Sequence, residues 1–559
     1  MPVVSIPAPL LNRLIGSQLT VDELNQVLTE LGCDVEGWDA QTLTFRINLL
    51  PARPDMFDVC GLARCIKGYL GIETGIPKFN FTDSGVRLTV KNGLEDVRPY
   101  ICAAVVRNLR LNEELLKLLM DLQENLHWGL GRDRRRASIG IYDLSKVEPE
   151  FFYQPVAPSD IRFVPLGGEK PLTPKELLTL HPKGQAYQHL LQGFSVYPLL
   201  TDRAGRVLSL PPIINSENTK VTPATKELFI DVTGPEEWAI KKTLFILAAA
   251  FSDLGALVQT VKIEFPQGKS WITPDMKPED FDLDSAEATS VIGTPITNGE
   301  MVRLLRRMRY DATVDEKHAK IRVSVPAYRA DIMHPWDVVE DVAIAYGLHR
   351  LQPRLLPTAT TSQPSPIEEL AQLCRRTMTG LGFIEIMSLN LSSPEAQFDR
   401  LGIAEDQRTV YLKNPVSIEQ RILRRHLLAG ILETFSLNST LALPQNIFEI
   451  GDVFQVDPGA ETGAFQERCL ALGMADAKIG FAEIKSVLEA LAREMDWQFT
   501  FIPHQQMPFL PGRCALVQAQ NKRTCGILGE VHPQILERYG LTVPVALAEI
   551  EIETLFRIP

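Results

Sequence analysis

Residues 326–347 read PAYRADIMHPWDVVEDVAIAYG, which predicts a polar loop followed by an amphipathic helix. Proline is favoured in the first turn of a helix, so we expect this helix to begin at Pro335. Three acids of the helix then stand at i, i+3 and i+4 on one face, after a further aspartate in the loop: Asp337, Glu340, Asp341 and Asp331. Such a set of carboxylates is typical of a hard cation such as Mg2+. The alternative is a solvated acidic face that the helix dipole stabilises.

The surrounding segment occurs twice in the chain. Residues 14–35 read LIGSQLTVDELNQVLTELGCDV and residues 291–312 read VIGTPITNGEMVRLLRRMRYDA, and the alignment continues with a one-residue gap. In each copy Ile-Gly precedes a threonine that can cap a helix, Thr20 or Thr297, and a strand and a Pro/Arg/Asp corner then lead into a second helix. An internal repeat of this kind predicts one small α/β module in two copies.

The two copies share their corner but differ at the acidic helix positions. The scaffold therefore does not require the acids of the second copy, which favours a specific role for them, such as metal binding. The aligned pairs are Arg53 with Arg329 and Asp55 with Asp331 at the corner, and Gly61 with Asp337, Arg64 with Glu340 and Cys65 with Asp341 on the helix.

The composition indicates a multi-domain protein of the cytoplasm. The chain has 559 residues, 45% of them hydrophobic, and a single core rarely grows past about 300 residues. A net charge of −12 argues against a generic nucleic-acid coat. The eight cysteines are scattered, as expected of reduced thiols. We expect no membrane contact, because the most apolar run, residues 244–257, is too short to span a bilayer.

Polar residues interrupt apolar strands in the middle of the chain. Residues 211–222 read PPIINSENTKVT, and Asp231 stands between Ile230 and Val232. Such a loop at a strand end is typical of a pocket rim, although a turn held by its own side chains is the alternative. Nearby, residues 131–136 read GRDRRR, which indicates either a solvated basic loop or an RNA phosphate contact.

A linker rich in Pro, Ser and Thr is predicted between Pro353 and Pro366. A second α/β region follows it, in which we expect Leu423, Leu427, Leu428 and Ile431 on the inward face of one helix. We therefore predict a multi-domain α+β protein with the duplicated module at residues 1–85 and 271–355, a mixed α/β domain at 86–270, and a last domain at 356–559.

Five groups of motifs, in this order and spacing, resemble one protein family. They are ARPD with GLAR and GYLGIETG; QENLHWGLGRDRRRASIGIYDL; HPKGQAYQHLLQGF with PPIINSENTKVT and FIDVTG; VPAYRADI with WDVVED; and NPVSIEQRILRRHLLAGIL with FEIGDVF and GILGEVHPQILERYGL. Over essentially its whole length the chain resembles the beta subunits of phenylalanyl-tRNA synthetase of the archaeal and eukaryote-cytosolic type.

The resemblance implies that ATP-dependent charging of tRNA(Phe) takes place in an alpha subunit, within a heterotetramer of two alpha and two beta chains. The last domain is then a class II synthetase-like antiparallel sheet with helices that is catalytically inactive. The sequence agrees with this expectation, since it shows no Gly-rich phosphate loop and no Arg-rich ATP-binding motif in that domain.

The resemblance also implies two sites. The middle domain is expected to hydrolyse Tyr-tRNA(Phe), and the second module is expected to hold Mg2+ in association with the alpha subunit. Two other hypotheses remain open, a freestanding editing hydrolase and a nucleic-acid-binding scaffold. The residues implied are His189, Asn215, Ser216, Glu217, Thr219 and Asp231 for editing, and Asp331, Asp337, Glu340 and Asp341 for the metal.

Overall fold

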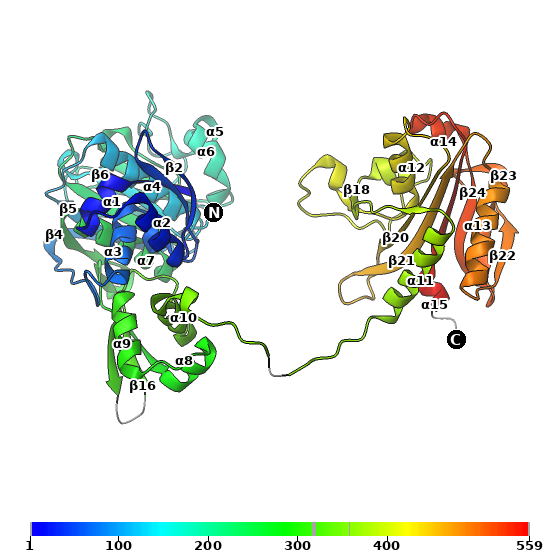
Figure 1. Cartoon of the computed structure of the whole chain (residues 1–559). Coiled ribbons are helices and arrows are strands. Elements are labelled where there is room, and N and C mark those ends of the chain that lie inside the picture. Colours follow the sequence, from blue (N-terminus) through cyan, green and yellow to red (C-terminus); the bar gives the residue numbers. More distant parts are fainter. Residues whose placement is uncertain (1–2, 316–319, 357, 557–559) are drawn as a thin grey trace. The chain divides into compact units, whose positions relative to one another are not determined.

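A computed structural model describes residues 3–315, 320–356 and 358–556, and Figure 1 shows its elements. The chain forms two compact units, which divide between Leu355 and Leu356. The described residues from 351 to 365 contain no helix or strand, in agreement with the predicted linker.

The internal repeat of the sequence is also a repeat of structure, because both copies have the same order of elements and the same strand order, β1-β3-β2 and β14-β16-β15. The first copy consists of β1 (Val3–Pro7), α1 (Ala8–Ile15), α2 (Val21–Glu30), β2 (Asp34–Asp39), β3 (Thr44–Asn48) and α3 (Val59–Tyr69). The second consists of β14 (Glu279–Asp284), α8 (Ser285–Ile292), α9 (Asn298–Arg307), β15 (Asp311–Asp315), β16 (Lys320–Val325) and α10 (Pro335–Tyr346).

The predicted helix starts are confirmed. Thr20 Oγ1 accepts from the backbone N–H of Glu23, and Thr297 Oγ1 accepts from that of Glu300. Helix α10 begins at Pro335, as its proline predicts. Local capping chemistry therefore sets where these helices begin.

A ten-stranded sheet lies between the two copies in sequence, with strand order β10-β9-β8-β7-β4-β12-β5-β11-β6 and β13 paired to β12. Its strands are β4 (Thr82–Val90), β5 (Tyr100–Arg107), β6 (Ser138–Asp143), β7 (Phe151–Val156), β8 (Tyr197–Asp202), β9 (Val207–Leu210), β10 (Ile214–Asn215), β11 (Leu228–Gly234), β12 (Leu257–Glu264) and β13 (Ser270–Thr273). The helices of this region are α4 (Glu113–Trp128), α5 (Pro174–Leu180), α6 (Pro182–Tyr187) and α7 (Glu237–Asp253).

Helix α7 contains much of the most apolar run of the sequence, and its residues from Leu244 to Phe251 are buried. It packs against β5, β11 and β12, and it also contacts α3 of the first copy. No helix in the described part of the chain is both long and apolar enough to cross a membrane.

The second unit is a seven-stranded sheet with helices on both faces. The strand order is β17-β20-β21-β25-β24-β23-β22, antiparallel except where β17 runs parallel to β20. The elements are α11 (Pro366–Gly380), β17 (Ile384–Glu385), β18 (Leu391–Ser392), β19 (Ile422–Leu423), α12 (Leu428–Leu437), β20 (Gln445–Val456), β21 (Ala464–Ala475), α13 (Phe481–Glu494), β22 (Phe499–Pro503), β23 (Phe509–Ala519), β24 (Thr524–Val531), α14 (Pro533–Arg538), β25 (Val545–Glu551) and α15 (Ile552–Phe556).

Successive residues of a strand face opposite sides of this sheet, and each side has its own hydrophobic core. Leu470 and Leu472 point to the core that α11 and α13 cover, whereas Ala471 points to the core that α12 and α14 cover. One expectation is corrected here. Leu423 was predicted on a helix with Leu427 and Leu428, but it lies in β19, and α12 begins only at Leu428.

Candidate functional site

A cavity of about 450 Å³ lies beside the central sheet, where β6, β9, β10 and β11 meet helix α4. Its walls are mainly apolar, which suits a flat hydrophobic group. Apolar lining residues include Leu116, Met120, Ile139, Ile141, Pro211, Ile213 and Val221.

Three hydrogen-bonded side chains from different strands line this cavity. The Tyr142 hydroxyl of β6 donates to Asp231 Oδ1 of β11 at 2.5 Å and lies 2.7 Å from Ser209 Oγ of β9. Gly140 leaves room for them, because a Cβ at that position would lie 1.9 Å from the Tyr142 hydroxyl oxygen. The strand pairing therefore places one carboxyl and two hydroxyls together within an apolar pocket.

Burial changes the pKa values of Asp231 and Tyr142. Asp231 is 1% exposed, and burial raises its pKa to about 7, against the opposing effects of the Tyr142 hydrogen bond and Arg98. Burial also raises the pKa of the Tyr142 hydroxyl well above its usual value. Asp231 therefore exists in both protonation states near neutral pH, as a general acid or base requires.

His127 of α4 is a second titratable group in the lining. Its Nε2 accepts from the backbone N–H of Ile139 at 2.8 Å, and burial lowers its pKa to about 4. The imidazole is therefore neutral at physiological pH and holds α4 against β6.

One arginine of the basic turn is buried, in contrast to both interpretations of residues 131–136, whereas Arg132 and Arg135 of the same turn are exposed. Arg134 is buried, and its Nη1 donates to the carbonyl oxygens of Ile213 at 2.9 Å and Pro212 at 3.3 Å. Its guanidinium also lies 4.4 Å from the ring centroid of Tyr187 and bonds Glu124. Arg134 thus braces the wall of the cavity and is not a side chain of a solvated loop.

The six predicted editing residues divide into three groups. Asn215, Thr219 and Asp231 line the cavity. Glu217 lies at its rim, where the carboxylate accepts from the Gly167 N–H at 2.7 Å and from Lys220 Nζ at 3.0 Å. The other two are not among the described lining residues: Ser216 is fully buried, and His189 is exposed on a short 3-10 helix, Gln188–Leu190.

Sequence reasoning did not select Ser209, His127 or Tyr142 for this site. Ser209 is the one polar residue of the strand Val207–Leu210, and a polar residue in a fully buried strand is a usable signal. His127 gave no comparable signal, because only the packing of α4 brings it to the cavity. Tyr142 reaches the cavity through the pairing of β6 with β11.

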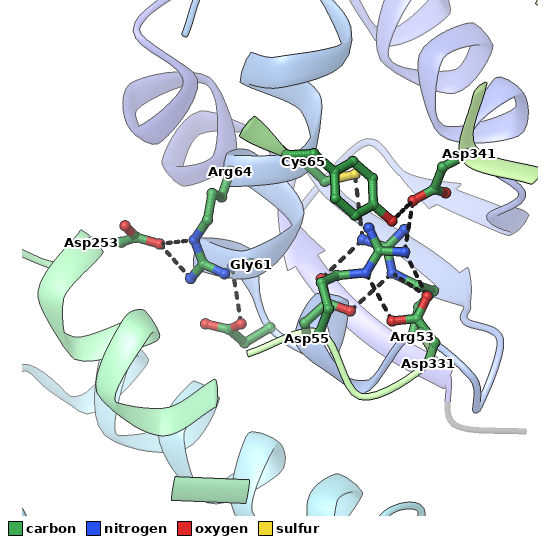
Figure 2. Close-up of polar contacts among 11 residues, drawn as sticks. Arg53, Asp55, Gly61, Arg64, Cys65, Asp253, Asp331 and Asp341 are labelled. Atoms are coloured by element: carbon green, nitrogen blue, oxygen red, sulfur yellow. Dashed lines mark hydrogen bonds and ion pairs between the residues drawn. The ribbon is translucent and has the colours of Figure 1, made fainter. Parts of the chain in front are cut away.

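The four predicted metal ligands do not fit a single magnesium ion. Arg329, 2% exposed, donates to both oxygens of Asp331 at 2.6 and 2.8 Å, and its Nη2 lies 2.7 Å from Asp341 Oδ2. Tyr310 also donates to Asp341. Figure 2 shows this cluster around the labelled Asp331 and Asp341. The positive charge between these two carboxylates is therefore a guanidinium.

The remaining two acids, Asp337 and Glu340, do not lie in this cluster of charges. Asp337 Oδ2 accepts from the backbone N–H groups of Met333 and His334, both at 2.8 Å, and so caps its own helix. Glu340 is exposed and makes no hydrogen bond or ion pair to a residue that the structure describes. No group of three His, Cys, Asp or Glu side chains in the described ranges is arranged to hold a metal ion. The expectation of four converging ligands is therefore corrected.

The corner of the first copy meets that of the second. Arg53 pairs with Asp55 at 2.9 Å and lies 3.8 Å from Asp331. Burial alone would raise the pKa of Asp331, but Arg329 and Arg53 lower it to about 2. Arg64 of the first copy turns away and binds Asp253 of α7, as Figure 2 shows. The shared corner residues thus join the two copies.

Three family models match the chain. A B3/4 domain model matches residues 103–248, which contain the cavity around Asp231, and a tRNA synthetase B5 domain model matches residues 281–348. A model described as the phenylalanyl tRNA synthetase beta chain CLM domain matches residues 352–552.

Full-length relatives agree with these models. The phenylalanine–tRNA ligase beta subunit of Methanococcoides burtonii is 36% identical over 552 residues, which cover 99% of this chain and 100% of the relative. That of Methanocaldococcus jannaschii is 37% identical over 558 residues, with 99% and 100% covered. The chain belongs to the family of phenylalanine–tRNA ligase beta subunits. The resemblance seen in the five groups of motifs is thereby confirmed.

A solved structure supports the fold of this family member. An N-terminal fragment of the phenylalanyl-tRNA synthetase beta subunit from Pyrococcus horikoshii matches with a TM-score of 0.59 and 35% identity. The match covers 62% of this chain and 99% of the fragment. As a beta subunit, the chain is a component of a ligase complex that acts in protein synthesis.

Proposed function

We propose that the cavity around Asp231 hydrolyses tyrosine from mischarged tRNA(Phe), as an editing site of the ligase complex. A pocket that selects phenylalanine cannot strongly reject an isostere that only adds a hydroxyl, so a second, hydrolytic site is needed for accuracy. The observation that carries the proposal is a carboxyl with a pKa near 7 inside an apolar cavity of about 450 Å³.

The reaction breaks the ester bond between the amino acid carbonyl carbon and a ribose oxygen. A water molecule attacks that carbon, and Asp231 in its ionised form accepts the proton that the water loses. The same proton then passes to the ribose oxygen as it leaves. The apolar walls hold the aromatic ring, and Asn215 and Thr219 supply polar contacts within the lining.

Aminoacylation itself is proposed to take place in an alpha subunit bound to the second unit. Apolar side chains that face water over a large area mark interaction surfaces. Met387 is 94% exposed and Val416 97% exposed in this unit. They belong to an exposed apolar set in residues 384–443 that we assign to the alpha subunit: Ile384, Met387, Leu389, Val416, Ile418, Leu437 and Leu441.

We propose no magnesium ion at Asp331 and Asp341, because Arg329 pairs with both carboxylates and Arg53 lies 3.8 Å from Asp331. Of the four predicted ligands, Glu340 is the acid that is exposed and unengaged among the described residues. A magnesium site that includes this helix would need its other ligands from the alpha subunit.

The test uses the chain in complex with its alpha partner. Asp231→Asn should slow the release of tyrosine from Tyr-tRNA(Phe) at least tenfold and leave phenylalanine charging within twofold of wild type. Ser209→Ala is a second variant in the same group of side chains. His189→Ala is the matched control, because His189 is exposed and outside the described lining, and its rate of release should not change.

Two results would contradict the proposal. Unchanged tyrosine release in both Asp231→Asn and Ser209→Ala would remove this cavity from the reaction. Alternatively, a chain that elutes alone and releases tyrosine without any partner would favour the freestanding hydrolase.

A further inference from the structure

A second cavity, of about 520 Å³, lies where the two copies of the module meet the end of α7. Its lining includes residues of α3, of the loop that follows α3 up to Phe79, and Arg309 of the second copy. Gly68 permits this close approach, because a Cβ there would lie 2.3 Å from the carbonyl oxygen of Arg307 and 2.6 Å from Arg309 Cδ.

The charges in this lining are unbalanced. Four cationic side chains face two carboxylates: Arg64, Lys67, Lys78 and Arg309 against Glu73 and Asp253. The local excess is two positive charges, in a chain whose net charge is −12. A cavity with an excess of positive charge attracts an anion.

Both arginines are buried and have spare donors. Arg64 uses Nε and Nη2 for Asp253, and its Nη1 finds no acceptor among the described residues. Arg309 binds the Glu73 backbone oxygen through Nη1, while its buried Nε has no partner in the described part of the chain. Arg64 Nη1 is therefore free to bond an acceptor in the cavity, whereas Arg309, whose Nη2 also lies 3.6 Å from Glu73 Oε2, contributes mainly its positive charge to the lining.

The backbone of Arg309 supports a role for its side chain. Arg309 has a left-handed φ of +69°, two residues beyond the end of α9. The aligned residue of the first copy, two residues beyond α2, is Gly32 with φ +79°. Glycine is the favoured residue in this conformation. The second copy therefore has an arginine where the backbone favours glycine, and its guanidinium contacts Glu73 and lines the cavity.

We propose that this cavity binds a phosphate group, with Arg64 as a buried donor, Arg309 as a buried positive charge, and Lys67 and Lys78 as more exposed donors. Phosphate offers several acceptor oxygens to guanidinium and ammonium donors, which suits two arginines that approach from different modules. The phosphate comes either from the backbone of transfer RNA or from a free phosphate or nucleotide. This binding does not depend on the proposed hydrolytic site.

The first experiment titrates the full chain with inorganic phosphate by calorimetry at constant ionic strength. Wild type should bind one phosphate saturably, and Lys78→Gln and Arg309→Gly should each weaken that binding at least tenfold. Lys78 makes no hydrogen bond or ion pair with another described residue, and glycine fits the backbone at position 309, so both variants should fold. Circular dichroism checks this.

The matched control is Arg322→Gln, which removes an arginine of the second copy that pairs with Asp280 outside the cavity. Its phosphate affinity should stay within twofold of wild type. Absence of saturable phosphate binding by wild type, or equal affinity in wild type, Lys78→Gln and Arg309→Gly, would overturn the proposal.

A second arm identifies the source of the phosphate. If the ligand is a phosphate of transfer RNA, inorganic phosphate should compete with tRNA, and Lys78→Gln should lower the slope of log affinity against log salt by about 1. If tRNA affinity and slope are unchanged while phosphate binding is lost, the ligand is a free phosphate or nucleotide. Either result supports a phosphate-binding site and identifies which kind of phosphate it binds.

Discussion

Asp231→Asn should change how the stability of the chain depends on pH. The folded state raises the pKa of Asp231 from 3.8 to about 7, mainly through burial. The folded chain therefore keeps a proton that the unfolded chain releases between about pH 4 and pH 7, and stability falls as pH rises through this range. A pKa increase of this size contributes about 4 kcal/mol to the free energy of unfolding at low pH, and this contribution is fully lost above pH 7.

Urea unfolding at several pH values between about 4 and 8 would measure this effect. Five of the six tryptophans lie in the first unit, so fluorescence reports mainly on the unit that contains Asp231. Compared with Asp231→Asn, wild type should lose about 4 kcal/mol of unfolding free energy as pH rises from 4 to above 7. Taking the difference between the two proteins removes the contributions of all other titrating groups.

Tyr142→Phe provides the complementary variant. The Tyr142 hydrogen bond lowers the pKa of Asp231, so its removal should extend the loss of stability to pH values above 7. Parallel pH curves for wild type and Asp231→Asn would refute the reasoning, since they would mean that Asp231 ionises alike in the folded and unfolded chain.

The joint between the two copies and the surface of the second unit give two further predictions. Arg329→Met should destabilise the first unit by about 3–5 kcal/mol, because it leaves Asp341 buried without its cation and leaves Asp331 with only the more distant Arg53. EDTA should leave the thermal midpoint of the wild-type chain unchanged within 1 °C; a clear decrease would show a bound metal that stabilises the fold. Replacing Met387 and Val416 by glutamate should reduce co-purification of the alpha subunit at least tenfold, with unchanged circular dichroism. Undiminished co-purification would place the partner elsewhere.

Much of the local structure was predictable. The start of α10 at Pro335 and the caps Thr20 and Thr297 follow from side chains within a few residues of each helix end. The repeat was visible because both copies bury equivalent apolar positions. The strand Ile422–Leu423 was missed, since an apolar run next to a helix does not show where the helix begins.

The candidate site was predictable only in part. Asn215, Thr219 and Asp231 were selected correctly as neighbours, because polar residues beside buried strands are conspicuous. Arg134 was misread as a solvent-facing or RNA-facing side chain, since its carbonyl partners at Pro212 and Ile213 are distant in sequence.

The helix over Pro335–Tyr346 shows most clearly which properties depend on the sequence alone and which depend on the tertiary structure. The sequence by itself determined the helix, its first residue and the spacing of its acids, because helical period and capping are local properties. Only the tertiary structure decided what those acids bind. Folding brings Arg329 and Tyr310 onto Asp341, turns Asp337 back to its own helix and leaves Glu340 in water. Carboxylates bind the nearest available positive charge, and its identity depends on contacts that spacing along the chain does not specify.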